Sequence, residues 1–114
     1  METTVRDKRS MIMQMRDVIV QTVNPVRIIL FGSFATGKAT PFSDVDFLVI
    51  EDTEFGAHRS RRKEAARIWA ALLAFDMPKD ILVYTEEGCK KARGNPNHVV
   101  EQAMKYGQVI YERT

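Results

Sequence analysis

The stretch from residue 27 to residue 50, RIILFGSFATGKATPFSDVDFLVI, constrains the fold more than any other part of the chain. It begins and ends with short apolar runs rich in β-branched residues, which are typical of buried strands. Gly32 and Ser33 end the first run, and Asp44 and Asp46 open the second after ten intervening residues. The stretch therefore predicts two strands joined by a turn, with polar groups where the first ends and the second begins.

Asp44 and Asp46 occupy alternate positions of the second expected strand. Side chains of a strand alternate between its faces, so both carboxylates should project from one side, with Cα atoms roughly 6.5 Å apart. Carboxylates this close repel each other unless a cation lies between them, and a pair of Mg²⁺ ions is the usual occupant in nucleotidyl transfer. Gly32 and Ser33 can present N–H groups and a hydroxyl to a phosphate. One stretch thus offers ligands for metal ions and for a phosphate.

Hydrophobic periodicity and turn signals predict an alternation of helices and strands along the rest of the chain. Ser33 is expected to start a short helix as its N-cap residue. Residues 51–56 are expected to form a loop. The expected elements are helices over 4–23, 57–75, 86–93 and 98–105, strands over 26–31, 44–50 and 80–84, and an extended tail over 109–111.

Bulk properties favour one globular domain over residues 1–114 in a reducing compartment, the cytoplasm. A length of 114 residues, 45% hydrophobic and 28% charged, is ordinary for such a domain. There is no apolar run long enough for a membrane span and no secretory h-region at the N-terminus. The single cysteine, Cys89, cannot form an internal disulfide. The net charge of +2 is too small to indicate nucleic acid as the main partner.

A third carboxylate, Asp80, opens the third expected strand. If the second and third strands are neighbours, Asp80 can approach Asp44 and Asp46, and three carboxylates around two divalent ions suit in-line attack at a nucleotide phosphorus. Asp80 would then be closest to the nucleophile and could accept its proton. Asp76 is the rival for this role, but it precedes Pro78 in a turn, where capping or solvation explains an acid. Gly-Ser and Asp-x-Asp are each common by chance; their joint placement on successive strands favours the functional interpretation.

The pattern Gly32-Ser33, ten residues, Asp44-Val45-Asp46 resembles the signature of the nucleotidyltransferases of the DNA polymerase beta superfamily. The short chain, the strand around Asp80 and the ending VEQAMKYGQVIY over 100–111 are similar to the minimal nucleotidyltransferase subgroup. The resemblance implies an α/β (α+β) domain with a small mixed sheet flanked by helices. It also implies two Mg²⁺ ions bound by Asp44, Asp46 and Asp80, and transfer of AMP from ATP, whose triphosphate is held by Gly32 and Ser33.

Minimal members of this subgroup often pair with a small all-helical HEPN toxin. The resemblance implies that the chain acts as an antitoxin, by adding AMP to a tyrosine of such a toxin, and a homo-oligomer is possible. Many members have Gly-Ser-Arg-x-Arg-Gly, whereas Phe34 and Thr36 stand at the two arginine positions here. Lys38 is expected to supply a point charge to the nucleotide, without the bidentate fork of a guanidinium.

Three functions from different classes remain open from the sequence. The first is protein adenylylation, and the second is an antitoxin with a weak or inactive site that neutralises its helical partner by binding. The third is modification of a small molecule, for which the chain is short of an acceptor domain. The basic run over 58–63 is either a solvated helix face or a contact for phosphate or an acidic partner. His58 and His98 are expected at the surface. Trp69 is expected in the core or an interface.

Overall fold

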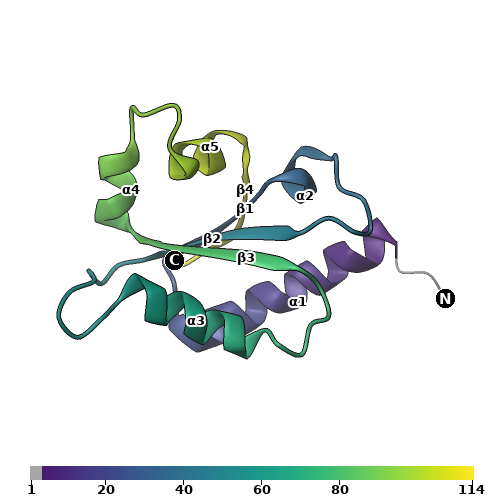
Figure 1. Cartoon of the computed structure of the whole chain (residues 1–114), viewed down its shortest axis with the longest axis horizontal. Helices are drawn as coiled ribbons and strands as arrows, with labels where there is room; N and C mark the ends of the chain where they lie inside the picture. Colours follow the sequence, from purple (N-terminus) through teal and green to yellow (C-terminus); the bar gives the residue numbers. More distant parts are fainter. Residues whose placement is uncertain (1–3) are drawn as a thin grey trace.

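The chain folds into a four-stranded mixed sheet with helices on both faces, as expected from the sequence (Figure 1). The computed structural model describes residues 4–114; the expected single domain also includes residues 1–3, which lie outside the described residues. The elements in chain order are α1 (Val5–Val23), β1 (Arg27–Phe31), α2 (Ser33–Thr36), β2 (Val45–Glu51), α3 (Arg61–Ala71), β3 (Lys79–Thr85), α4 (Glu86–Ala92), α5 (Val99–Tyr106) and β4 (Gln108–Glu112).

The strands lie in the order β3, β2, β1, β4. β1 is antiparallel to both of its neighbours, and β2 is parallel to β3. The chain between β2 and β3 includes α3, as a parallel pair requires a crossover connection. β4 pairs with β1 along most of its length, so the expected extended tail over 109–111 is a strand of the sheet.

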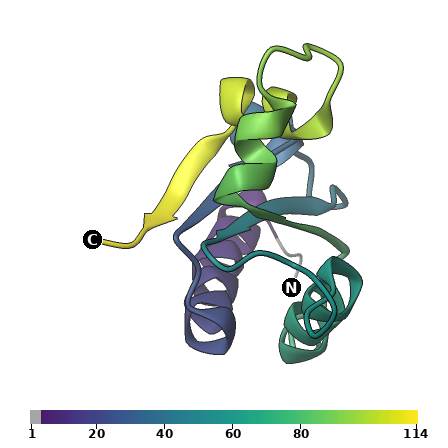
Figure 2. The same ribbon diagram turned by 90° about the vertical axis from the view of Figure 1, so that its left-hand side faces the viewer.

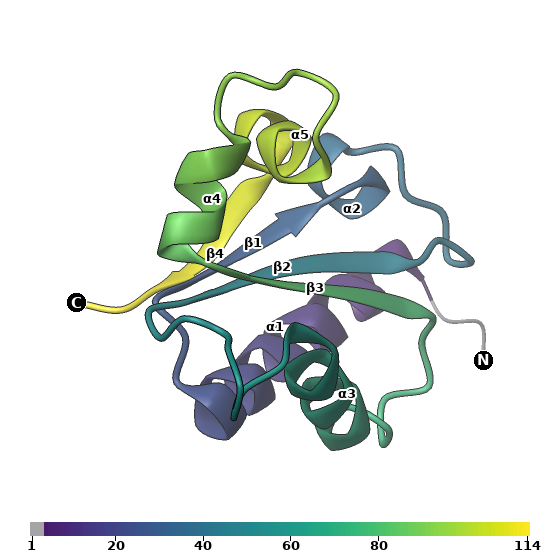
Figure 3. The same ribbon diagram turned by 60° about the vertical axis from the view of Figure 1, so that its left-hand side comes forward.

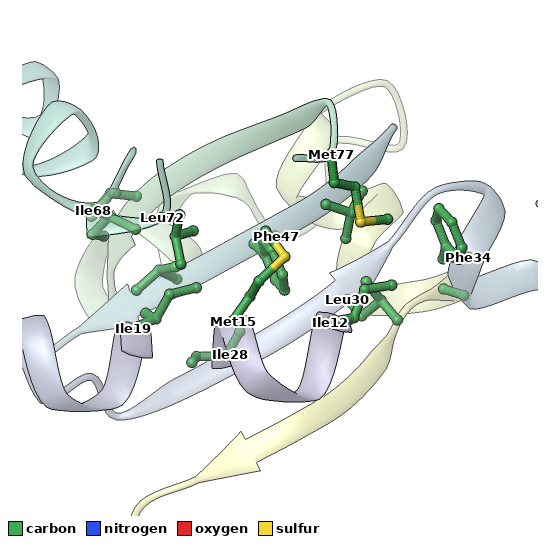
Figure 4. Packing of buried hydrophobic residues seen from close by; sticks show 14 residues of the cluster. Ile12, Met15, Ile19, Ile28, Leu30, Phe34, Phe47, Ile68, Leu72 and Met77 are labelled. Atoms are coloured by element: carbon green, nitrogen blue, oxygen red, sulfur yellow. The ribbon is translucent and has the colours of Figure 1, made fainter. Parts of the chain in front are cut away.

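Two hydrophobic clusters cover the two faces of the sheet. α1 and α3 pack on one face and α4 and α5 on the other (Figures 2 and 3). β2 shows why: Phe47 belongs to the first cluster and Leu48 to the second, since successive side chains point to opposite faces. Figure 4 shows the first cluster, in which Ile12 and Met15 of α1 lie close to the strands. The two central strands, β1 and β2, are therefore mostly buried on both sides.

α1 and α3 differ in how well the sequence defines their limits. Thr4 and Asp7 form a capping box that starts α1, close to the expected position. The helix expected over 57–75 is shorter: it begins at Arg61, because the Ser60 side chain accepts a hydrogen bond from the N–H of Lys63, and it ends at Ala71. Two expected boundaries were thus wrong by about one turn.

The buried side of α3 also differs from the expectation. Ile68 and Leu72 are fully buried, but Trp69 is 46% exposed and Leu73 is 60% exposed, so Trp69 is not a core residue. Glu51, expected in a loop, is the last residue of β2 and is buried. No helix in the described part of the chain has the length and apolar character needed to cross a membrane.

Candidate active site

Asp46 and Asp80 lie side by side on neighbouring strands. They are register partners in the parallel pair of β2 and β3, so they project from the same face of the sheet. On this face the next residues along the two strands, Leu48 and Leu82, pack beneath α4 and α5. Neighbouring strands are about 4.8 Å apart. The second and third strands are therefore neighbours, which was the condition for Asp80 to approach Asp46.

Gly32 lies directly against the carboxylate of Asp46. Phe31, the last residue of β1, is the register partner of Asp46, so the chain turns away from the sheet beside this aspartate. Gly32 has φ of +74°, and a Cβ atom at this position would collide with Oδ2 of Asp46. Glycine is required here both for its backbone conformation and for the close approach. The turn after β1 and the acidic start of β2 therefore form one unit.

The electrostatics of this unit favour a cation. Burial, followed by the charge of Asp80, contact with its carboxyl group and the charge of Asp44, raises the pKa of Asp46 to about 6. Within residues 4–114, none of the ion pairs involves Asp44, Asp46 or Asp80, so no basic side chain in this range pairs with them. Carboxylate oxygens are the ligands that Mg²⁺ prefers. The donor atoms and their mutual repulsion fit a divalent cation.

Asp44 is less well placed than the other two acids. It is exposed and lies just before β2 begins at Val45, although its charge still acts on Asp46. In the described residues, no three His, Cys, Asp or Glu side chains are already arranged so that they could hold a metal ion. The structure thus brings two of the three expected ligands together, and metal binding by Asp44, Asp46 and Asp80 stays a prediction.

A cleft of about 280 Å³ lies beside the two carboxylates. Asp46 and Asp80 provide its polar side, and the remaining lining residues are Phe31, Ile81, Leu82 and Val99. Val99, the first residue of α5, is 41% exposed. The sequence gives no local signal for this role of Val99, because only the packing of α5 on the sheet brings it to the cleft. The cleft offers apolar walls next to a negatively charged edge.

The Gly-Ser turn differs in detail from the expectation. Gly32 is the N-cap residue of the one-turn helix α2, and Ser33 is its first residue rather than its cap. Phe34, at the first expected arginine position, is fully buried in the cluster beneath the sheet, and Thr36 is exposed. Lys38 is exposed, and its backbone N–H donates to the carbonyl of Ser33. That hydrogen bond ties Lys38 to the turn, while its role at the nucleotide stays a prediction.

The other residues singled out from the sequence have separate roles. Asp76 is exposed in the turn between α3 and β3. His98 is half-buried rather than at the surface, and it caps α5 by accepting from the N–H of Val100 through Nδ1. His58 is exposed, and Cys89 is buried in α4, where burial raises the pKa of its thiol.

The basic run over 58–63 is not simply a solvated face. Arg59 reaches back to two acids: Nη2 lies 3.4 Å from Oε1 of Glu51, and Nη1 lies 3.1 Å from Oε2 of Glu64. The guanidinium of Arg61 lies 4.0 Å from the centroid of the Tyr84 ring. Glu51 and Glu64 were not singled out from the sequence, and Glu51 was expected in a loop.

Comparisons with known proteins agree with this architecture. A family model described as nucleotidyltransferase domain matches residues 12–110. A Sulfolobus solfataricus protein to which nucleotidyltransferase activity is ascribed superposes with a TM-score of 0.64 at 14% identity, over 99% of this chain and 91% of that chain. A chain from a toxin–antitoxin structure with AMP-PNP superposes with a TM-score of 0.56 at 19% identity, over 90% of this chain and 74% of that chain. No curated protein matches the sequence. At these identities the two structural similarities concern the fold alone.

Proposed function

Because the chain belongs to the nucleotidyltransferase domain family, we propose that it transfers a nucleoside monophosphate, AMP from ATP, to an acceptor hydroxyl in the presence of Mg²⁺. The observation that carries this proposal is the pairing of Asp46 with Asp80, directly beside the glycine turn at Gly32. Adjacent carboxylates next to a glycine turn that can present N–H groups to a phosphate are what nucleotidyl transfer needs.

Asp44, Asp46 and Asp80 would hold two Mg²⁺ ions, with Asp44 as the ligand that turns inward to complete the set. When bound, these ions supply Lewis acidity: they activate the attacking hydroxyl and neutralise charge on the triphosphate and the pyrophosphate leaving group. The raised pKa of Asp46 supports this assignment, since its carboxylate is crowded by like charges that a cation would relieve.

The remaining residues of the site bind and orient the substrates. The N–H groups at Gly32 and the hydroxyl of Ser33 hold oxygens of the triphosphate, and the ammonium group of Lys38 adds a point charge. Asp80 is more exposed than Asp46, and it accepts the proton of the acceptor hydroxyl. The apolar walls of the neighbouring cleft exclude water from one side of the reacting groups.

The acceptor in this proposal is a protein: a tyrosine of a small all-helical HEPN toxin, in the cytoplasm. The chain then acts as an antitoxin, because the added AMP blocks the toxin. The resemblance of the sequence to minimal nucleotidyltransferases supports this, as does the shared fold with a chain of a toxin–antitoxin structure. In this proposal the acceptor side chain enters the cleft of about 280 Å³ beside Asp46 and Asp80.

The test uses the purified chain, labelled ATP, Mg²⁺ and the helical protein encoded beside it. We expect labelled AMP on the partner, lost when its acceptor tyrosine is changed to phenylalanine. The double variant Asp44→Asn with Asp46→Asn should abolish labelling, while Asp76→Asn, which changes an exposed acid outside the site, should preserve it. Undiminished labelling by the double variant would contradict the assignment.

One observation favours a second function, neutralisation of the partner by binding alone. Phe34 replaces an arginine and is fully buried, so no guanidinium is available from this position of the turn. If binding suffices, a variant with Asn at positions 44, 46 and 80 should still neutralise the toxin in cells. If AMP transfer is required, the same variant should bind the partner and fail to neutralise it.

A further inference from the structure

α2 is too short to hold itself in place. A helix of four residues satisfies few of its own carbonyl groups, because the last four carbonyls of any helix have no partner within it. The carbonyl of Gly32 accepts from the N–H groups of Ala35 and Thr36, and the carbonyl of Ser33 accepts from the N–H of Lys38. The next two carbonyls, of Phe34 and Ala35, point away from Gly32 toward the carboxyl end of the helix.

Two side chains that are distant in sequence donate to these carbonyls. Nη2 of Arg9, on α1, donates to the carbonyl of Phe34 at 2.6 Å, and Nε2 of Gln108, on β4, donates to the carbonyl of Ala35 at 2.8 Å. Both hydrogen bonds are partly buried. The charge of Arg9 suits this place, since the carboxyl end of a helix carries partial negative charge.

The same turn is anchored on its other sides. The ring of Phe34 packs in the cluster near Leu30 and Ile12 (Figure 4), and Gly32 lies against Asp46. We propose that Arg9 and Gln108 are positioning residues, which hold the Gly32–Ser33 turn at a fixed place beside Asp46 through the carbonyls of Phe34 and Ala35. They act from outside the site, and neither touches the substrates.

The consequence for function rests on the proposed nucleotidyl transfer. The Ser33 hydroxyl and the Asp46 carboxylate belong to different elements, and both must meet one metal–nucleotide complex. A turn that is already held in place loses less conformational entropy when the nucleotide binds. The affinity of the site for the nucleotide is therefore higher. The chain lacks arginines beside Gly-Ser, and preorganisation of the turn offsets part of the lost phosphate contacts.

The first part of the test needs no nucleotide. Hydrogen exchange of the amides over residues 32–38 is measured in the full chain for Arg9→Ala and Gln108→Glu. Gln108→Glu keeps the shape of the side chain but replaces the N–H donor by an acceptor. We expect exchange to be about tenfold faster in each variant, as loss of one hydrogen bond predicts. Arg9→Lys, which keeps the charge and one donor, should recover part of the protection.

Two variants of the same chemistry serve as controls. Arg16→Ala removes another arginine of α1, whose Nη1 donates to the carbonyl of Ile110 at 3.4 Å instead of to α2. Gln102→Ala removes another amide–carbonyl bond, from Nε2 to the carbonyl of Pro96 at 2.6 Å. Neither control should change exchange over residues 32–38. Equal exchange in Arg9→Ala, Gln108→Glu and the controls would overturn the proposal.

The second part measures the dissociation constant of MgATP by titration calorimetry. Arg9→Ala and Gln108→Glu should raise it about tenfold relative to the two controls at matched melting temperature. Faster exchange with unchanged affinity would overturn the positioning role. If the wild type binds no nucleotide, the proposed function fails and the positioning role for nucleotide fails with it, whereas the exchange data still decide whether the two side chains hold the turn.

Discussion

The carboxylate of Asp46 occupies the space that a side chain on residue 32 would need. Gly32 has a positive φ and approaches Oδ2 of Asp46 so closely that even a methyl group would collide with it. Motifs that are twelve residues apart in the sequence therefore share one small volume. The phosphate-binding turn and the metal-binding strand of the proposed site cannot move independently.

Gly32→Ala should damage the site more than the fold. The backbone conformation of Gly32, with φ of +74° and ψ of −156°, is essentially restricted to glycine and costs another residue on the order of 1–3 kcal/mol. The new methyl group also displaces Asp46. We expect nucleotide transfer to fall at least about 100-fold, as misplacement of reacting groups by about 1 Å predicts. Transfer assays and thermal melts measure the two effects.

Gly37→Ala is the matched control for Gly32→Ala. Gly37 also has a positive φ, of +80°, but a Cβ atom there would meet no atom within 4 Å. Gly37→Ala should lose roughly 1–2 kcal/mol of stability, no more than Gly32→Ala, and keep most of the transfer activity. Equal losses of activity in the two variants would mean that the contact between Gly32 and Asp46 has no functional role.

Asp46→Asn should stabilise the protein without added cation and remove its response to Mg²⁺. The raised pKa of Asp46 shows that its charged form is disfavoured in the fold. Since solvent screens partly exposed charges, we expect a gain of only about 1 kcal/mol. Mg²⁺ should raise the melting temperature of the wild type and of Asp76→Asn, but not of Asp46→Asn. A cation response that survives in Asp46→Asn would exclude Asp46 as an essential ligand.

Glu51 should make stability depend on pH near neutrality. Burial, then the hydrogen bond and charge of Glu64, raises the pKa of Glu51 from 4.5 to about 7 despite the nearby Arg59. A folded state that binds its proton more tightly than the unfolded state loses stability as pH rises, here from about 4.5 through about 7. Burial acts to raise the pKa of Glu64, but hydrogen bonds with Glu51 and Arg59 bring it below 4.5. The ionisation of Glu64 therefore affects stability only at more acidic pH.

Glu51→Gln tests this directly, because glutamine stays neutral at every pH. Thermal melts of the wild type should show a fall in stability between pH 6 and pH 8, on the order of 1 kcal/mol. The fall should be much smaller in Glu51→Gln and unchanged in Glu54→Gln, which alters an exposed residue of the following loop. A wild-type profile that is flat over this range would show that Glu51 is already ionised in the fold.

The sequence predicts the centre of the molecule better than its periphery. The strand ending at Phe31 and the acidic strand after it are defined by local pattern, because each is a short, almost continuous apolar run bounded by polar or turn residues. Asp46 pairs with Asp80 because β2 and β3 are parallel neighbours, and α3 lies in the crossover connection that joins them. The two strands depend on short-range patterns that a single sequence contains, whereas the pairing of Asp46 with Asp80 depended on the condition that their strands are neighbours.

Features that depend on tertiary packing could not be predicted in the same way. Val99 lines the cleft because α5 packs on the sheet, and Arg9 reaches Phe34 because α1 crosses beneath it. Trp69 was expected in the core or an interface, yet the neighbouring Ile68 and Leu72 fill the space against the core. For Val99 and Arg9 the partner is far away in sequence, and periodicity gives no information about it.

Binding of MgATP by the wild type and by Asp46→Asn with Asp80→Asn tests the central claim most directly. Titration calorimetry with ATP should show binding by the wild type that requires Mg²⁺, and the double variant should lose it although its melting temperature is no lower than that of the wild type. Asp76→Asn should bind like the wild type. Equally tight, Mg²⁺-dependent binding in the double variant would contradict the claim that the paired carboxylates beside Gly32 form the nucleotide site.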